Sequence, residues 1–516
     1  MYGSKLSKRM LDMAISNPGS ENAATIVPFG RIVTRVTARG GEHLLRAHLG
    51  RMRRLIAHSV NFDDIRAEFG LPEEYPAEAV AEAADATDRA GESRRDARDL
   101  VLVTIDPPGS MDLDQAMLVA RDGPGFVLYY AIADVGALVV PGGCLDTESH
   151  RRGQTVYLPD GTVPLHPKNL SEGSACLLPD EERPAALWTI RLGADGEPTS
   201  WEVERATVMS RARFTYAEVQ AAVDAGSVHP SLEPLADLGA LRIDRAAERG
   251  AIELKLPEQD VVRVDDRWTV TVAPRTDVDD WNAQMSLLTG MCAARIMLDG
   301  GVGLLRTLPP AADEDVEALR RAALALDIAW PQGEAAGTVL ARLDANAPTT
   351  MALMTEATRL LRGANYTPFD GDAPQHPNHS GIGAPYAHVT APLRRLIDRF
   401  GTEICLALVA GTPVPDWVTA AVATLPDEMR STGSVANKVD RACVDLTEAT
   451  VLAERVGEQF TATVLRGRDG KKSAQIFLDD PVVIADCDGD PKDGTRAAVR
   501  LAEADTVTRR VRFELA

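Results

Sequence analysis

Apolar positions divide the chain into a region of predicted strands and flanking regions of predicted helices. Aliphatic residues run from Val101 to Ile105, and apolar and aromatic residues alternate from Phe126 to Val135, so both segments are predicted to be buried strands. A turn at 194–196 separates two more apolar segments, 187–192 and 201–209, and predicts that they pair as antiparallel strands. The pattern therefore predicts a sheet core that begins near residue 100.

Helical periodicity precedes and follows these strands. A charged segment at 91–99 is predicted to be a linker between the first helices and the sheet. After residue 456 the pattern changes to short apolar segments with glycine turns, which predicts a reduced OB-type barrel. The predicted helices are 62–69, 76–90, 217–225, 280–298 and 313–326, with helical sequence up to residue 453, and the predicted barrel strands are 460–465, 474–477, 482–485, 497–501 and 507–513.

Composition limits the class of protein. The 516 residues are 45% hydrophobic and 25% charged, which is typical of a globular protein in water. No apolar run approaches the ~18–20 residues that cross a bilayer, and the N-terminus lacks the apolar core of a signal peptide, so we expect no membrane partner. Six scattered cysteines without a C-x-x-C pair favour free thiols and the cytoplasm. The net charge of −21 argues against a protein that coats nucleic acid, although a narrow basic channel is compatible with an acidic exterior.

Three carboxylates follow the first predicted strand. Asp106 ends the strand, Pro107, Pro108 and Gly109 force a loop, and Asp112 and Asp114 are two residues apart, so they point the same way in an extended chain. No lysine or arginine separates them, and such carboxylates repel one another unless a cation is bound. Mg²⁺ typically takes one or two carboxylates together with phosphate and water. The spacing is compatible with a Mg²⁺ or Mn²⁺ site for phosphoryl chemistry, and equally with an acidic loop whose carboxylates cap turns.

The sequence TIDPPGSMDLDQA at 104–116 resembles the aspartate signature of the RNB family, the catalytic domain of ribonuclease II, RNase R and the exosome nuclease. Asp106, Asp112 and Asp114 match aspartates of the signature, and Gln115 stands where the family usually has a fourth. The resemblance implies that these four residues hold the metal, and that Asp114 is catalytic. Because a glutamine oxygen brings no charge, we expect one tightly bound and one loosely bound ion. The alternative is that Gln115 turns away into a hydrogen bond with the neighbouring loop.

The sequence YAHVTAPLRRLID at 386–398 resembles a second motif of the same family. Pro392 is predicted to occupy the first turn of a helix, which would place Arg394 at a helix N-terminus, where phosphate binds favourably. The resemblance implies that Arg394 is catalytic, stabilising the scissile phosphate, and that Arg395 binds substrate. Without the first motif, a surface arginine pair on an ordinary helix would be the better interpretation.

The Pro- and Gly-rich segment 150–185 also resembles the family and is predicted to be an ordered wall without regular structure. The resemblance implies that Tyr157 packs on the 3′-terminal nucleotide and that Tyr216 lies near its sugar. The alternative for Tyr157 is a core tyrosine. Asp134, at the end of a predicted strand, matches a family aspartate but is predicted to cap a turn. Zinc is disfavoured because His376, His379 and His388 lack ligand spacing.

The resemblance covers about 99–455 and implies an α+β fold, in which an RNB-type catalytic domain with a mixed or antiparallel sheet is wrapped by helices and followed by a small OB-like barrel. The implied function is a metal-dependent 3′-to-5′ exoribonuclease that hydrolyses single-stranded RNA to nucleoside 5′-monophosphates with Mg²⁺ or Mn²⁺, as a monomer. The alternatives are an RNA-binding pseudoenzyme, in which Gln115 marks a degenerate metal site, and a small-molecule phosphoesterase. The expected domains are an unassigned extension at 1–50, a helical arm and linker at 51–98, the catalytic domain at 99–455 and the barrel at 456–516.

Overall fold

The computed structural model describes residues 60–516 except 265–266, 273–274 and 471. The extension at 1–50, which we left unassigned, lies outside the described residues. Among the described residues, no helix has both the length and the apolar character needed to cross a membrane.

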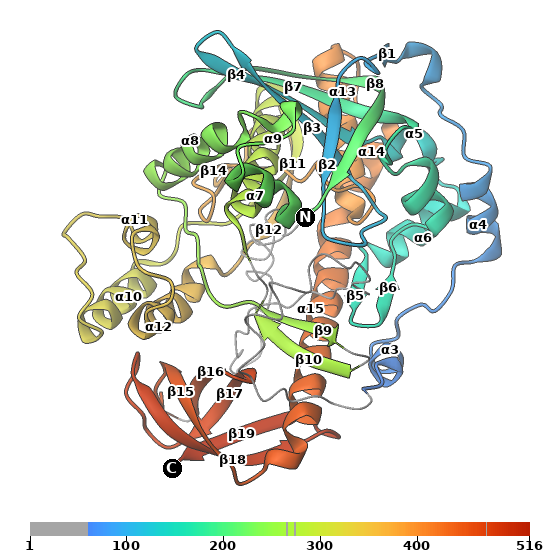
Figure 1. The fold of residues 1–516 in the computed structure, drawn as a ribbon. Helices are drawn as coiled ribbons and strands as arrows, with labels where there is room; N and C mark the ends of the chain where they lie inside the picture. The colour runs from blue at the N-terminus through green and yellow to red at the C-terminus, as the bar shows by residue number, and fades with distance from the viewer. Residues whose placement is uncertain (1–59, 265–266, 273–274, 471) are drawn as a thin grey trace.

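A six-stranded mixed sheet forms the centre of the catalytic region (Figure 1). Its strands are β1 (Arg95–Asp96), β2 (Leu102–Ile105), β3 (Gln115–Asp122), β4 (Gly125–Ala133), β7 (Glu182–Leu192) and β8 (Pro198–Phe214). The order is β1-β8-β2-β3-β4-β7, with β1 and β2 parallel to β8 and the other neighbours antiparallel. Because β7 also pairs with β8, the five strands β8, β2, β3, β4 and β7 close into a ring. The strands predicted around 101–105, 126–135, 187–192 and 201–209 are confirmed.

The charged segment 91–99 is not a linker, and that prediction is wrong. Its residues Arg95 and Asp96 form β1, which pairs with Ala206 and Thr207 of β8. The preceding Arg94 side chain is 1% exposed and forms ion pairs with Asp88 and Asp134. Ion pairs with distant residues therefore hold this segment against the sheet, although its composition alone predicts exposure to solvent.

The central helix α9 (Asp277–Gly300) is buried along most of its length and packs against α8 (Leu235–Glu248), α13 (Leu396–Ala410) and β11 (Val302–Thr307). Thr276 and Asp279 form a capping box at its start, since the Thr276 backbone N–H donates to the Asp279 carboxylate over 2.8 Å. Gly301 ends it with φ +71°, a left-handed conformation that favours glycine. The core helix predicted at 280–298 is confirmed.

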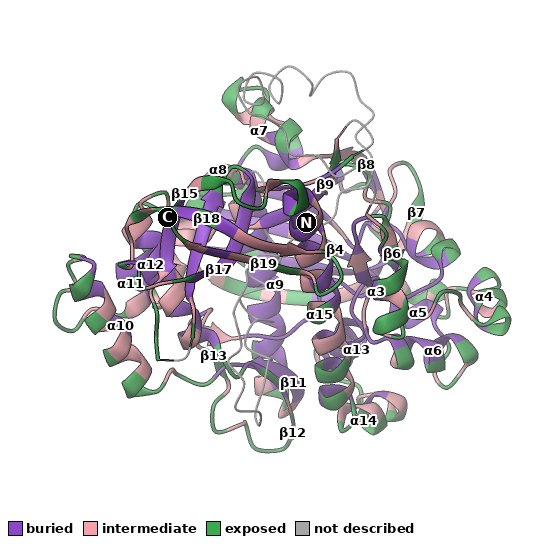
Figure 2. Ribbon diagram, turned by 90° about the horizontal axis from the view of Figure 1, so that it is seen from below, coloured by how far each residue is buried: buried purple, intermediate pink, exposed green. Residues whose placement is uncertain are grey.

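The outer helices follow the predicted periods with one exception. Helices α3 (Asp63–Glu68), α7 (Tyr216–Asp224) and α10 (Asp313–Ala325) agree with their predictions. The helix predicted at 76–90 is too long, because α4 spans only Ala77–Ala84. Beyond it, the Asp88 carboxylate accepts the backbone N–H of Ala90 over 3.0 Å, a local contact that competes with helix formation. Figure 2 shows exposed residues on α4 and α10 and buried residues toward the centre of the molecule.

Further elements complete the region between the sheet and the C-terminal barrel. The long helix α15 (Leu425–Leu452) runs from the sheet region to the barrel (Figure 1). The other elements of this region are α5 (Val135–Leu138), α6 (Cys144–Arg152), β5 (Val156–Leu158), β6 (Gly161–Val163), β9 (Gln259–Val264), β10 (Arg267–Val272), α11 (Ala336–Ala341), α12 (Pro348–Ala357), β12 (Asn365–Asp370), β13 (Asn378–His379), β14 (Ala384–Pro385) and α14 (Asp416–Val422).

The C-terminal strands close into a five-stranded barrel, as predicted. Alternate residues of its strands fill the interior, while Phe477 and Ile484 point outward and are buried with Val439 and Cys443 of α15. The last strand begins at residue 510, later than the predicted 507, because the Asp505 carboxylate accepts backbone N–H groups in a turn. The strands are β15 (Gln459–Arg466), β16 (Ala474–Asp479), β17 (Val482–Asp488), β18 (Arg496–Asp505) and β19 (Arg510–Leu515).

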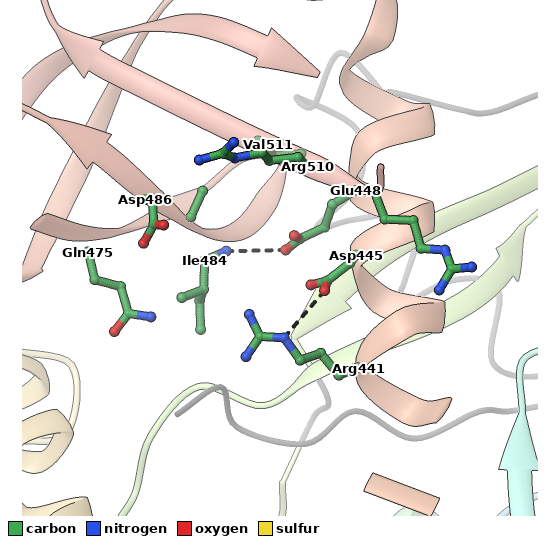
Figure 3. Close-up of a pocket in the computed structure, with 10 residues that line it drawn as sticks. Arg441, Asp445, Glu448, Gln475, Ile484, Asp486, Arg510 and Val511 are labelled. Carbon is green, nitrogen blue, oxygen red and sulfur yellow. Dashed lines mark hydrogen bonds and ion pairs between the residues drawn. The ribbon is translucent and has the colours of Figure 1, made fainter. Parts of the chain in front are cut away.

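The seam between α15 and the barrel contains a polar pocket (Figure 3). Glu448 of α15 reaches into the seam, where Oε1 accepts hydrogen bonds from Nε2 of Gln259 over 2.5 Å and from the Ile484 backbone N–H over 3.2 Å. Burial, together with the nearby Asp445 carboxylate, raises the pKa of Glu448 to about 8. A titratable group therefore joins α15 to the barrel.

Candidate active site

Two segments that are far apart in sequence meet at the ends of the sheet strands. The first is the loop 106–114 between β2 and β3, which carries the three aspartates. The second is the segment 390–395 just before α13. Together they form a compact site in which most polar side chains are buried.

Asp114 and Arg394 connect these segments. Nε of Arg394 donates to Oδ2 of Asp114 over 3.0 Å, and the backbone N–H of Leu393 donates to Oδ1 over 2.8 Å. The Asp114 and Arg394 side chains are 1% and 2% exposed. Burial, opposed by the Arg394 charge and assisted by Asp112, raises the pKa of Asp114 to about 7. The structure thus brings together the two residues that the resemblance marks as catalytic.

Asp106 and Asp112 lie on the same loop. The Asp106 backbone N–H donates to the Phe214 carbonyl oxygen over 2.9 Å, which extends the pairing between β2 and β8. Its side chain is buried, Oδ2 has no hydrogen-bond partner among the described residues, and burial raises its pKa. Asp112 is half-buried, and its Oδ2 lies 3.5 Å from the Tyr157 hydroxyl.

This set of donors suits a hard divalent cation. Asp106 offers a buried oxygen without a hydrogen-bond partner among the described residues, and burial raises the pKa of both Asp106 and Asp114, so a bound cation would stabilise their charged forms. Within the described part of the chain, no three His, Cys, Asp or Glu side chains are grouped so that they could hold an ion. The protein would therefore supply part of the coordination shell, and phosphate and water the rest, as is usual for Mg²⁺.

Helix α13 begins at Leu396, so the prediction that Pro392 starts a helix is wrong. Residues 392–394 form a turn, and Arg395 is the N-cap residue. The turn is stabilised by Asp398, which accepts the Ala391 backbone N–H over 2.7 Å. The interpretation of Arg394 and Arg395 as a surface pair is also wrong, because both are buried. Nη1 of Arg394 has no hydrogen-bond partner among the residues described.

The other predicted substrate residues differ in their surroundings. Tyr157 is half-buried beside Asp112 at the site. Tyr216 is 4% exposed in the main core, and its hydroxyl accepts a hydrogen bond from Asn282 over 3.1 Å. Arg395 directs Nε and Nη2 to the two oxygens of Asp398 over 2.7 and 2.6 Å. This geometry favours a structural role for Arg395, and its predicted contact with substrate stays a prediction.

Gln115 uses both ends of its amide within the protein. Oε1 accepts a hydrogen bond from the Tyr130 hydroxyl over 2.5 Å, and Nε2 donates to the Thr390 carbonyl oxygen over 2.5 Å. This is the arrangement of the alternative in which residue 115 bonds to the neighbouring loop. Its predicted role as a metal ligand stays a prediction.

Sequence reasoning missed Cys176 and Arg213. The Cys176 thiol donates to the Met111 carbonyl oxygen over 2.8 Å and accepts the Leu113 backbone N–H over 3.1 Å, so it holds the loop on either side of Asp112. The Arg213 charge lowers the pKa of Asp106 against the larger effect of burial. The position of Cys176 within the family-like segment 150–185 was the signal available for it.

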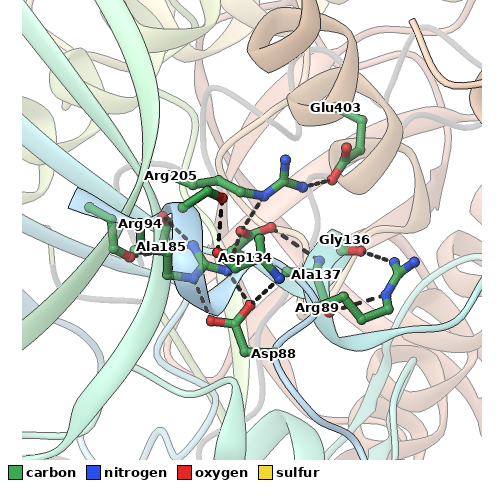
Figure 4. A network of polar contacts seen from close by, with 12 residues as sticks. Asp88, Arg89, Arg94, Asp134, Gly136, Ala137, Ala185, Arg205 and Glu403 are labelled. Carbon is green, nitrogen blue, oxygen red and sulfur yellow. Dashed lines mark hydrogen bonds and ion pairs between the residues drawn. The ribbon is translucent and has the colours of Figure 1, made fainter. Parts of the chain in front are cut away.

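Asp134 caps a turn, as predicted. Its Oδ1 accepts the Ala137 backbone N–H over 3.2 Å at the start of α5. Its Oδ2 accepts Nη2 of Arg94 over 2.7 Å and Nε of Arg205 over 3.0 Å (Figure 4). Arg205 in turn pairs with Glu403 of α13. The network therefore ties α13, which begins two residues after Arg394, to β8 and α5.

Comparison with known proteins identifies the family. The RNB domain family matches residues 94–404, and the RNase II-type exonuclease C-terminal S1 domain matches residues 458–516. The chain belongs to the RNB family. Ribonuclease R of Chlamydia trachomatis is 27% identical over 360 residues, which cover 66% of this chain and 50% of that protein. The chain spans about half the length of the ribonuclease R relatives that it matches first.

Solved RNB structures share the fold. Mycoplasma genitalium RNase R in complex with ribose-methylated single-stranded RNA aligns with a TM-score of 0.79 at 20% identity, covering 88% of this chain and 78% of that one. Yeast Ssd1, a pseudonuclease, aligns with a TM-score of 0.62 at 16% identity, covering 81% of this chain and 54% of that one. Both an RNase and a pseudonuclease share this fold. The fold alone therefore does not distinguish an active nuclease from an inactive protein, and the side chains of the site have to be compared.

Proposed function

We propose that this RNB-family protein is a 3′-to-5′ exoribonuclease that hydrolyses single-stranded RNA to nucleoside 5′-monophosphates with Mg²⁺ or Mn²⁺. The buried contact between Asp114 and Arg394 carries the proposal, because it joins a cation-binding loop to a guanidinium at one point. RNB-family ribonucleases are metal-dependent in general, and relatives of this chain are named ribonuclease R.

Asp106, Asp112 and Asp114 would supply the protein's ligands to the cation, and because no three such side chains of the described residues are grouped around one point, phosphate and water would complete the shell. When bound, a divalent cation lowers the pKa of a coordinated water and stabilises the leaving oxygen of a phosphodiester. Asp114 also accepts a hydrogen bond from Nε of Arg394, so it would orient that guanidinium as well as bind the cation. Burial keeps the carboxylates away from competing water, which strengthens their interaction with a cation.

Arg394 would bind the scissile phosphate. Its Nε is fixed by Asp114, while the backbone N–H of Thr155 donates to its carbonyl oxygen over 3.0 Å. The guanidinium is thereby oriented, with Nη1 left to donate to a phosphate oxygen. A preorganised cationic donor of this kind stabilises the extra charge of the transition state.

Tyr157 would position the 3′-terminal nucleotide. It is half-buried and its hydroxyl approaches Asp112, which places an aromatic ring beside the metal-binding loop. Stacking on a ring tolerates any base, as a sequence-independent nuclease requires. Tyr216 lies in the core two residues beyond the strand that pairs with Asp106, and a contact with the terminal sugar would need its hydroxyl to leave Asn282.

The pseudoenzyme alternative is disfavoured by the site residues. A degenerate site would have lost carboxylates or the arginine, whereas this chain keeps Asp106, Asp112 and Asp114 on one loop and joins that loop to Arg394 through Asp114. Gln115 is the one departure from the signature, and its amide is occupied by Tyr130 and Thr390.

The proposal is tested with one single-stranded RNA labelled at either the 5′ or the 3′ end, incubated with protein and Mg²⁺ or Mn²⁺. A 3′-to-5′ exonuclease releases labelled mononucleotide from 3′-labelled RNA at once, and progressively shorter fragments from 5′-labelled RNA. A chelator should stop both. RNA binding without cleavage at any metal concentration would establish the pseudoenzyme, and internal cleavage products would exclude an exonuclease.

A further inference from the structure

Residues 114 and 115 contact the segment 390–394 at three points. Asp114 accepts hydrogen bonds from the Leu393 backbone N–H and from Nε of Arg394, and Gln115 donates one to the Thr390 carbonyl oxygen. Two neighbouring side chains thus bind the start and the end of one short segment. The position of Arg394 relative to the aspartate loop depends on these contacts.

The amide of Gln115 extends this junction to the sheet and the core helix. The Tyr130 hydroxyl, on the adjacent strand β4, donates to Oε1 of Gln115, and the Tyr130 side chain is 0% exposed. Oγ1 of Thr390 shares a hydrogen bond of 2.9 Å with Oγ of Ser286 on α9. Gln115 therefore links β4, through Tyr130, to a segment that α9 holds from the other side.

A neutral amide serves both of these partners in their present geometry. Its Oε1 accepts the Tyr130 hydroxyl, and its Nε2 donates to the Thr390 carbonyl oxygen, which can only accept. A carboxylate at position 115 would satisfy Tyr130 but would place a charged oxygen against the Thr390 carbonyl oxygen. In a buried site that repulsion would displace the 390–394 segment or force the carboxylate to be protonated.

We propose that Gln115 is a positioning residue that fixes Arg394 relative to the aspartate loop, and that it is not a metal ligand. The inference rests on the proposed nuclease function. It requires that the cation be held by Asp106, Asp112 and Asp114, and that the contact with Tyr130 be as important for turnover as Gln115 itself.

The test compares Gln115→Glu, Tyr130→Phe and the double variant. Gln115→Glu keeps the length of the side chain, removes the donor and adds a negative charge, while Tyr130→Phe keeps the packing and removes the hydroxyl. Matched controls are Gln459→Glu, at an exposed position of β15, and Tyr129→Phe, the neighbouring tyrosine on β4. Each protein is measured for kcat and KM on single-stranded RNA, for Mn²⁺ affinity by electron paramagnetic resonance, and for thermal unfolding.

A positioning role predicts that each single variant loses roughly ten- to hundredfold in kcat, as expected when a catalytic group is displaced by about an ångström. KM and the Mn²⁺ dissociation constant should change by less than about threefold. The double variant should be no slower than the slower single variant, because both substitutions disrupt one junction. The two controls should match the parent.

A ligand role predicts a different pattern. Gln115→Glu would then tighten Mn²⁺ binding by about tenfold or more, because the new ligand adds charge, while Tyr130→Phe would leave kcat unchanged. Either result would overturn the inference. If the parent protein has no nuclease activity, the proposed function fails instead, and additive losses of thermal stability in the double variant would still reject the junction between Gln115 and Tyr130.

Discussion

Asp114 and Arg394 lie 280 positions apart in the chain, yet Nε of Arg394 donates to Oδ2 of Asp114 over 3.0 Å in a place where both side chains are almost fully buried. Removal of one partner of a buried ion pair strongly destabilises the folded protein, because the other charge stays buried without compensation. Substitutions at either residue therefore act on stability as well as on chemistry, so thermal unfolding of each Arg394 and Asp114 variant is measured beside its activity.

Arg394→Ala should lower kcat on single-stranded RNA by on the order of 10²–10³, with a smaller loss of RNA affinity, because it removes one preorganised cationic donor. The measurement is kcat together with an RNA dissociation constant in the absence of metal. Arg121→Ala, at an exposed arginine of β3, is the matched control. If RNA affinity alone falls, Arg394 holds the substrate without stabilising the transition state.

Cys176→Ala should weaken Mn²⁺ binding, since the thiol holds the backbone on both sides of Asp112. Cys176→Ser should weaken it less, because a hydroxyl retains a donor and an acceptor at that position. Mn²⁺ titration by electron paramagnetic resonance gives the comparison, and Cys144→Ser, at an exposed cysteine, controls for the loss of a thiol. Equal Mn²⁺ affinity in all four proteins would show that the loop is held without Cys176.

The free energy of unfolding should fall as pH rises from about 4.5 to about 8 through the contribution of Glu448. Burial raises its pKa to about 8 in the folded protein, whereas the unfolded chain releases this proton near the ordinary value of 4.5. Between these values the folded state binds more protons, so its stability declines with increasing pH.

Glu448→Gln should flatten this decline while keeping the hydrogen bonds from Gln259 and the Ile484 N–H. Denaturant unfolding at about pH 5 and about pH 8 measures the change, with the exposed Glu454→Gln as the control. A Glu448→Gln variant whose pH dependence parallels that of the parent would mean that Glu448 ionises normally in the folded protein.

Strand and helix periods predicted most of the fold. The strands predicted at 101–105 and 126–135 and the core helix predicted at 280–298 were found at 102–105, 125–133 and 277–300, because a short aliphatic run, an alternating segment and a long apolar run each mark a buried element. The errors arose where polar side chains decide the backbone. The Asp88 carboxylate accepts the Ala90 backbone N–H beyond the end of α4, which is earlier than predicted. The Asp398 carboxylate accepts the Ala391 backbone N–H and stabilises the turn before α13, which begins later than predicted. Neither contact has a periodic signature in the sequence.

Sequence reasoning proposed the members of the candidate site but not the contacts between them. The spacing of Asp106, Asp112 and Asp114 suggested a cation site, and the family resemblance marked Arg394. Local sequence cannot show that Asp114 would bond to Arg394, because the contact depends on tertiary packing across the whole domain. The same holds for Gln115, whose partner on β4 is set by strand pairing and whose other partner precedes α13.

The rate at which Asp114→Asn releases mononucleotides from 3′-labelled single-stranded RNA tests the central claim most directly. Asp122→Asn, at the exposed last residue of β3, the strand that begins directly after Asp114, is the matched control. We predict that Asp114→Asn abolishes release while its RNA affinity stays within a few-fold of the parent, and that Asp122→Asn cleaves like the parent. Release by Asp114→Asn at a rate comparable to the parent would contradict the assignment of this site.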